Sequence, residues 1–405
     1  MKKTLAAVAV LGAFAGSALA ADVQLYGIVD TGVGYNHVDM DSLDGVSLYN
    51  GGKAVYSFAD SDSFSMMSGQ ASGSRWGLKG TEDLGNGLTV GFILEDGFTS
   101  DNGADSAPMF NRESSLFVQG GFGKFAMGRM GSLNNGQSSW AKVGMVSAFG
   151  TSDWGGYSAQ LGNIFSLAGQ WDNMVAYETP SFAGFKVYAQ YAMGSNDNEN
   201  ESSSDRYYAI GATYNNGPFA GYFAVDSINY QTSGAKIDDK FIDDSLTVTL
   251  GGSWNFEVAK VYFGAQYFDE VKLSSIGGIT KTTVSGVDLS KLGGPDITVG
   301  ALLKVKGYGI SLTADAPVAG GKAMFGVGYV DAEAADSTQD YLKDNNADVD
   351  LDLKRYVVSV GYDYPFSKRT DVYAIASYMQ DQVDVASEDW DPSAYTLYVG
   401  LRHRF

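Results

Sequence analysis

Short segments in which apolar and polar residues alternate recur along this chain as far as its last residue. In one of them, Leu246 and Val248 fall on one face while Thr247 and Thr249 fall on the other. Successive side chains of a β-strand point to opposite faces, so each segment predicts a strand with one apolar and one polar side. The pattern restricts the chain to an all-β fold.

Sixteen strands are predicted. The second strand begins at residue 74 and ends at the turn that starts at 85. The other fifteen span residues 23–35, 88–98, 112–120, 124–130, 174–179, 185–191, 207–214, 219–227, 246–256, 260–268, 297–316, 323–331, 355–364, 371–379 and 395–405. Short turns such as Gly85-Asn86-Gly87 alternate with long polar loops, of which 36–72 is the first. An even strand number and this alternation of connection lengths are typical of bacterial outer-membrane barrels.

A closed barrel follows from the membrane environment. An open sheet edge in lipid would leave unpaired backbone groups, so the strand 23–35 should run antiparallel to 395–405. About sixteen strands leave an aqueous channel inside a barrel. No apolar run of about 18 or more residues follows the amino terminus, which excludes a helical membrane protein. We therefore predict a 16-stranded antiparallel transmembrane β-barrel.

Residues 1–20 read as a secretory signal peptide, with Lys2 and Lys3, an apolar run and the cleavage sequence Ala18-Leu19-Ala20. The barrel domain would be 21–405. Removing two of the 27 basic residues leaves 25 against 47 acidic ones, a net charge of −22. That balance argues against a nucleic-acid partner.

Two stretches depart from the simple scheme. The apolar residues of 297–316 change from odd to even positions near Gly307, which predicts a β-bulge there unless 297–305 is outer loop. Residues 131–173 carry three tryptophans and no strand pattern. A loop of this length is usually functional, so we expect it to fold into the lumen and narrow the pore.

Several motifs together resemble the Gram-negative general porins of the neisserial and β-proteobacterial type. They are Leu25-Tyr26-Gly27-Ile28-Val29-Asp30, Gly73-Ser74-Arg75-Trp76-Gly77-Leu78-Lys79-Gly80, Glu82-Asp83-Leu84-Gly85-Asn86-Gly87-Leu88, Gly128-Arg129 and the terminal Phe405. The resemblance implies passive diffusion of ions and small hydrophilic solutes through an eyelet made by the third loop. It also implies a homotrimer with contacts through strands 1–5 and the end of strand 16. Phe405 would be the assembly signal for the barrel-insertion machinery.

The same resemblance maps the basic wall of the constriction onto Arg75 and Arg112, with Arg129 beside them. It maps the acidic partner onto Asp153, within Ser152-Asp153-Trp154-Gly155-Gly156. Ala176 stands where relatives often carry Arg, which argues against a strongly anion-selective pore. Other cations are expected on the general lumen wall: Lys79, Lys186, Arg355 and Arg402.

The remaining predictions concern ligands and alternatives. Acidic stretches at 196–205, 331–352 and 381–391 are expected in outer loops, as solvated loops or as weak sites for divalent cations that bridge lipopolysaccharide. We expect no other cofactor or metal and no enzymatic activity, because His37 in a loop and His403 on the lipid face offer no catalytic constellation. A substrate-selective porin would use lumen aromatics, for which Tyr26, Tyr188 and Tyr262 are candidates. A structural or adhesive barrel with a closed lumen is a third possibility.

Overall fold

The computed structural model of this protein describes residues 22–41, 47–50, 53–57, 59–105, 108–194, 204–230, 243–279, 304–344, 351–385 and 388–405. The predicted signal peptide and residues 297–303 lie outside these ranges. No helix in the described ranges is long and apolar enough to span a membrane.

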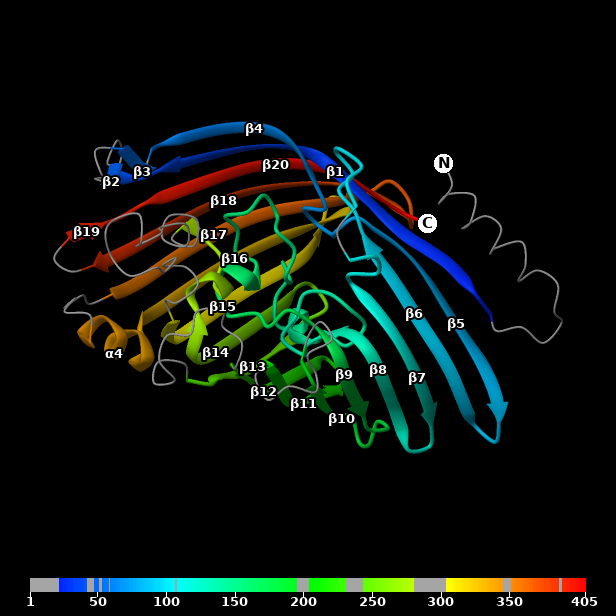
Figure 1. The fold of residues 1–405 in the computed structure, drawn as a ribbon. Helices are drawn as coiled ribbons and strands as arrows, with labels where there is room; N and C mark the ends of the chain where they lie inside the picture. Colours follow the sequence, from blue (N-terminus) through cyan, green and yellow to red (C-terminus); the bar gives the residue numbers. More distant parts are fainter. Residues whose placement is uncertain are drawn as a thin grey trace.

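The described chain forms one closed antiparallel barrel (Figure 1). Eighteen strands belong to the sheet; β19 is a short addition to the wall, and β4 and β5 pair with successive parts of β1 and count as one, so the ring has sixteen strands. The ring strands are β1 (Gln24–Asp39), β5 (Arg75–Gly85), β6 (Leu88–Gly97), β7 (Glu113–Gly120), β8 (Gly123–Gly131), β9 (Gln170–Glu178), β10 (Phe185–Ala192), β11 (Arg206–Asn216), β12 (Phe219–Asn229), β13 (Ser245–Asn255), β14 (Lys260–Lys272), β15 (Lys304–Val318), β16 (Gly321–Ala334), β17 (Leu351–Pro365), β18 (Thr370–Val385) and β20 (Ser393–Arg404). The predicted sixteen-stranded architecture is confirmed.

The first and last strands close the ring. β1 and β20 are antiparallel partners from Ile28 opposite Arg404 to Asp39 opposite Ser393. Beyond that ladder, the backbone amides of Gly27 and Phe405 each donate to the carbonyl of the other, at 3.1 and 3.0 Å. The red β20 accordingly lies beside the blue β1 in Figure 1. The predicted pairing of the two ends is confirmed.

The region predicted as a polar loop, 36–72, is largely strand. β1 continues to Asp39, so His37 lies in a strand. β4 (Ser61–Ser68) pairs with the second half of β1, residues 31–38. β5 pairs with the first part of β1, residues 24–28. β4 and β5 are thus two parts of one strand, interrupted at residues 69–74. A small hairpin of β2 (Ser47–Asn50) and β3 (Lys53–Ser57) precedes them.

A β-bulge does lie beside Gly307, as predicted, but it belongs to the neighbouring strand β14 and not to β15. Phe268 of β14 pairs with Gly307 and Val271 pairs with Val305, so the extra residue belongs to β14. Glu270, inside this bulge, has φ of 51°. β15 keeps one parity throughout, because Val305 is an inward-facing apolar residue and is fully buried. Because Val305 is apolar although it faces the lumen, the sequence pattern of β15 suggested a change of register that the strand does not have.

Two of the acidic stretches are also more ordered than predicted. β16 continues to Ala334, and a helix, α4 (Asp336–Asp344), follows it. β18 extends to Val385 before the short β19 (Glu388–Trp390), so the start of 381–391 is strand. Most of 196–205 lies outside the described residues.

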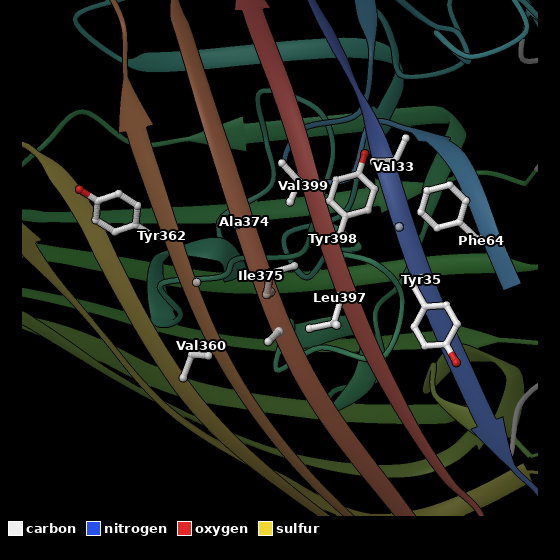
Figure 2. A pocket seen from close by; sticks show the side chains of 13 residues that line it. Val33, Tyr35, Phe64, Val360, Tyr362, Ala374, Ile375, Leu397, Tyr398 and Val399 are labelled. Atoms are coloured by element: carbon white, nitrogen blue, oxygen red, sulfur yellow. The ribbon is translucent and has the colours of Figure 1, made fainter. Parts of the chain in front are cut away.

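Strands such as β17 and β20 have one buried and one exposed face. On β20 the buried residues Thr396, Tyr398 and Arg402 alternate with exposed Leu397 and Val399, as the sequence pattern predicts. On the outward face, an apolar groove of about 620 Å³ crosses β17, β18, β20, β1 and β4. Figure 2 shows side chains that line it, among them Leu397 and Val399 on β20 and Phe64 beside Val33.

The barrel contains an apolar core of its own. The segment between β8 and β9 holds the fully buried Leu133, Val146, Ile164 and Phe165. These side chains rest on glycines of the opposite wall, where a Cβ atom would come within 3.0 Å of them: Gly211, Gly251, Gly264 and Gly328. Gly309 is closer still, because its Cβ would lie 2.0 Å from the carbonyl oxygen of Ile164. Two short 3-10 turns, η3 (Val143–Val146) and η4 (Leu161–Asn163), shape this segment. We call residues 132–169 the inner loop.

Candidate functional site

The tip of the inner loop meets the break between β4 and β5. The amide of Trp154 donates to the carbonyl of Gln70 at 2.8 Å, and the amide of Gly155 donates to the Gln70 side chain at 2.7 Å. Thr396 of β20 donates to the carbonyl of Gly155 at 3.1 Å. Residues 69–74 therefore turn inward and support the loop tip that carries Asp153.

Asp30 holds this inward turn in place. Its buried carboxylate accepts the amides of Ala71 and Ser72 at 3.0 and 2.7 Å and the hydroxyl of Tyr373 at 2.5 Å. Arg402 adds a hydrogen bond to the hydroxyl of Ser72 at 2.8 Å. A buried carboxylate with several donors satisfies its hydrogen-bonding capacity, so the turn is well defined.

The predicted basic wall converges on one carboxylate. Arg112 donates to Glu95 at 2.7 Å, and the Arg75 guanidinium lies 3.7 Å from the other oxygen of Glu95. Glu95 also accepts the hydroxyl of Tyr26 at 3.0 Å. Arg112 reaches the inner loop as well, where Gln137 accepts a hydrogen bond from it at 2.7 Å. The structure thus brings Arg75 and Arg112 together and partly neutralises both.

Arg129 and Asp153 lie at the same place. Arg129 pairs with Asp172 at 2.5 Å and donates to the carbonyl of Asn111 at 2.8 Å. A polar cavity of about 340 Å³ is lined by Arg112, Arg129 and Asp153, with Gln137 among the inner-loop residues that complete it. Three of the four residues assigned by sequence to the constriction therefore line one polar space, and the fourth, Arg75, is linked to it through Glu95, which it shares with Arg112.

The far end of the inner loop is anchored by Arg355. This buried side chain forms a two-pronged pair with Asp381, at 2.6 and 2.8 Å, and donates to the carbonyl of Asn163 at 3.0 Å. Further bonds join the loop to inward side chains of β14 and β17, including the amides of Ser166 to Gln266 and of Ala159 to Ser359. Arg355 is a lumen-wall residue that fixes the loop.

The other predicted wall residues also face inward. Lys186 pairs with Glu178 at 3.1 Å, Arg402 pairs with Asp371 at 2.9 Å, and Lys79 lies over the ring of Tyr26 at 5.1 Å. The three candidate lumen aromatics do not form one track. Tyr26 is on β1, Tyr188 on β10 and Tyr262 on β14, and each hydroxyl bonds to a different partner: Glu95, Thr213 and Asp315.

Two inward cations were not singled out from the sequence. Lys124 begins β8 on the lumen face, and Lys142 is the one basic residue of the inner loop. The position of Lys142 in an otherwise uncharged run of the loop was a usable signal. Its docking on the β10 wall, with Nζ 5.5 Å from the Tyr188 ring centre, could not be read from the sequence.

The histidines take part in outward-facing contacts. His37 lies 2.9 Å from Asp62 and stacks on Tyr395, and His403 lies 2.9 Å from the hydroxyl of Thr370. In the part of the chain that the structure describes, no group of three or more acidic or histidine side chains is arranged to hold a metal ion.

Comparison with known proteins gives the family. The chain matches the Gram-negative porins over residues 6–384. It belongs to that family. This porin is 33% identical to an outer membrane porin protein of Bordetella pertussis and 27% identical to the major outer membrane protein P.IB of Neisseria meningitidis, each over the full length of both chains. It is an outer-membrane β-barrel that forms a channel.

Solved structures agree with this fold. The porin resembles an anion-selective porin from Comamonas acidovorans, with 24% identity, a TM-score of 0.59 and coverage of 95% of this chain and all of that one. It also resembles the trimer form of OmpT from Vibrio cholerae, with 17% identity, a TM-score of 0.55 and the same coverage.

Proposed function

We propose that this porin lets ions and small hydrophilic solutes cross the outer membrane by passive diffusion along one side of its lumen. The observation that carries the proposal is the unequal filling of the barrel. The inner loop covers the wall from β11 to β17 with apolar side chains, whereas the space beside β5–β8 is polar and charged. Water and solutes would therefore pass beside Arg112, Arg129 and Asp153.

The narrowest part of that path would be the space between the arginine wall and the loop tip. Charged walls that face each other set the ion preference of a pore. Here each arginine has an acidic neighbour, because Arg75 and Arg112 share Glu95 and Arg129 pairs with Asp172. This near balance supports weak selectivity, in contrast to the anion selectivity named for the Comamonas protein.

The functional unit would be a homotrimer in contact with lipopolysaccharide, inserted by the barrel-assembly machinery. The second edge of β4 has no ladder partner within the described residues, and Phe64 and Met66 on this strand are 75% and 58% exposed. Unpaired backbone is unfavourable in lipid. Contact with a neighbouring protomer at β1, β4, β5 and the end of β20 would cover both the edge and these side chains. Divalent cations at the acidic outer loops would be weakly bound at most.

Planar-bilayer recording of the purified protein in asymmetric salt tests the function. We expect stepwise conductance in threes, with a small reversal potential. Saturable block of the current by one sugar, peptide or organic acid would favour a substrate-selective porin instead. An absence of conductance would favour the closed structural barrel.

A further inference from the structure

Beyond the constriction, the lumen holds a second group of cations near the short-turn end of the barrel. Lys124 lies next to the turn 121–123, and Lys186 follows the turn 180–184. The ladders place Lys124 opposite Glu178 and Glu178 opposite Tyr188, so these side chains share the inward face of β8, β9 and β10. In bacterial outer-membrane barrels the short turns are periplasmic.

The inner loop adds a third cation to the same wall. Ser139 is bonded to Glu113 of β7, at 2.7 Å from its amide, and the following residues continue across β8 and β10. Trp140 lies under the ammonium of Lys124 at 5.0 Å from its ring centre. Lys142 reaches Tyr188, and its ammonium donates to the carbonyl of Ser139 at 2.8 Å.

In the described part of the chain, the charges of Lys124 and Lys142 are not paired with carboxylates, whereas those of the constriction arginines are. The ammonium of Lys124 lies over the rings of Phe117 and Trp140, at 4.4 and 5.0 Å from the ring centres, and that of Lys142 contacts the Tyr188 ring and the carbonyl of Ser139. Within the described residues neither forms an ion pair, and only Lys186 pairs with Glu178. Aromatic faces attract an ammonium group without cancelling its charge. Three cations thus stand against two nearby carboxylates: Glu178, which pairs with Lys186, and Glu113, which accepts hydrogen bonds from Ser115 and Ser139.

The surroundings leave room for a ligand. Of the three lysines, Lys124 lines a pocket of about 320 Å³ at this end of the lumen, together with Lys79, Asp22 and Gln24. Burial lowers the pKa of Lys142 to about 8, as expected where a charge is poorly compensated. A bound anion would supply the missing partner for two ammonium groups.

We propose that Lys124, Lys142 and Lys186 form a binding site for divalent oxyanions, of the phosphate or phosphate-monoester class, on the periplasmic side of the constriction. A lysine ammonium binds phosphate as a point charge with three donors, and ligands with two negative charges gain most from two uncompensated cations. Monovalent anions would pass with little retention. The site rests on the proposed diffusion function and adds to it a preference for one class of solute.

The test uses the purified porin in bilayers at pH 7, with inorganic phosphate added on the short-turn side and acetate at equal ionic strength as the comparison. We expect phosphate, and not acetate, to reduce the chloride current in a saturable manner. The double variant Lys124→Gln/Lys142→Gln should raise the half-blocking phosphate concentration by about tenfold or more, which corresponds to 1.4 kcal/mol. Lys306→Gln/Lys354→Gln is the matched control, since both lysines face outward at the long-loop end.

Equal block in the wild type and the Lys124→Gln/Lys142→Gln variant would overturn the proposal, and so would an equal loss of block in the control variant. If the double variant does not fold, Lys142→Gln alone serves, because it changes only the loop. Phosphorus NMR line broadening of phosphate by the protein in detergent measures the site without any current. Broadening without chloride conductance would refute the diffusion function and keep the site; conductance without broadening would do the reverse.

Discussion

At the scale of single residues, Glu95 is the carboxylate that Arg75 and Arg112 share. It accepts from Arg112 and Tyr26 and lies near Arg75, so removing a cation leaves its carboxylate unbalanced. Two unit charges 4 Å apart interact by about 1 kcal/mol in bulk water and by about 4 kcal/mol at an effective dielectric constant near 20. A narrow site therefore amplifies small changes of charge.

Neutralising Arg75 and Arg112 together should shift the reversal potential toward cation preference, because Glu95 and Asp153 would then dominate. The measurement is the zero-current potential in a salt gradient. The effect should shrink with salt, since the screening length falls from about 10 Å at 0.1 M to about 3 Å at 1 M. Glu95→Gln serves as the control, because removing this negative charge should shift the reversal potential toward anion preference. An unchanged potential at low salt would mean that these arginines do not border the path.

The charge of the lumen should also respond to pH through Lys142. Burial lowers its pKa to about 8 against the influence of Glu178 and Glu113, with Lys124 and Lys186 acting in the same direction as burial. Lys142 is therefore cationic below about pH 8 and neutral above it. Anion permeability relative to cation permeability should fall between pH 7 and 9, as measured from reversal potentials. The step should be missing in Lys142→Gln; a step of equal size in that variant would assign it to another group.

At the scale of elements, the inner loop is held by shape as much as by hydrogen bonds. Glycines on the inward faces of the strands form shallow seats for Val146, Ile164 and Phe165. Closely packed interiors resist added methyl groups, because the neighbours must move or distort. The loop is thus positioned by the absence of side chains on the wall that it covers.

Gly309→Ala tests this positioning. The new Cβ would lie 2.0 Å from a backbone oxygen of the loop, so the loop must shift, and overpacking of this kind costs about 1–3 kcal/mol. We expect a lower unfolding temperature in detergent and an altered single-channel conductance. Gly144→Ala is a suitable control, because Gly144 has open space around it. Equal behaviour of the two variants would contradict a tightly seated loop.

The contrast between wall and loop explains what could be predicted from sequence. Strands such as β13 and β20 alternate because one face is apolar, and that pattern is local. β4 was missed because Ser61–Ser68 alternates serine with Phe64 and Met66 inside a stretch that is otherwise polar. The seats of the inner loop could not be foreseen, since a glycine in a strand does not indicate what will rest on it. The gathering of Arg112, Arg129 and Asp153 rests on contacts between distant segments and came from the family resemblance.

At the scale of the whole molecule, the barrel depends on its seam. The seam joins the two ends of the chain, and its last two hydrogen bonds join Gly27 and Phe405. The Phe405 ring faces outward and lies over Gly27, where a Cβ atom would come within 2.3 Å of it. Backbone pairing and the aromatic ring thus act at one place.

Deleting Phe405 should reduce the amount of heat-modifiable porin in the outer membrane, because it removes both backbone bonds, worth about 1 kcal/mol each, and the ring. Phe405→Ala separates the two contributions by keeping the backbone, and Phe405→Trp should be tolerated. The readout is the fraction of folded protein on unheated gels of outer-membrane extracts. Wild-type levels in the deletion would show that neither contribution is needed for insertion.

The seating of the inner loop also has a consequence for the order in which the molecule is made. The loop, residues 132–169, precedes in the chain the strands whose glycines receive its apolar side chains, from β11 with Gly211 to β16 with Gly328. The ribosome therefore synthesises the inner loop before the strands that surround it. The later strands can close only around a loop already folded back inside, so this porin would complete its interior and its wall in a single step.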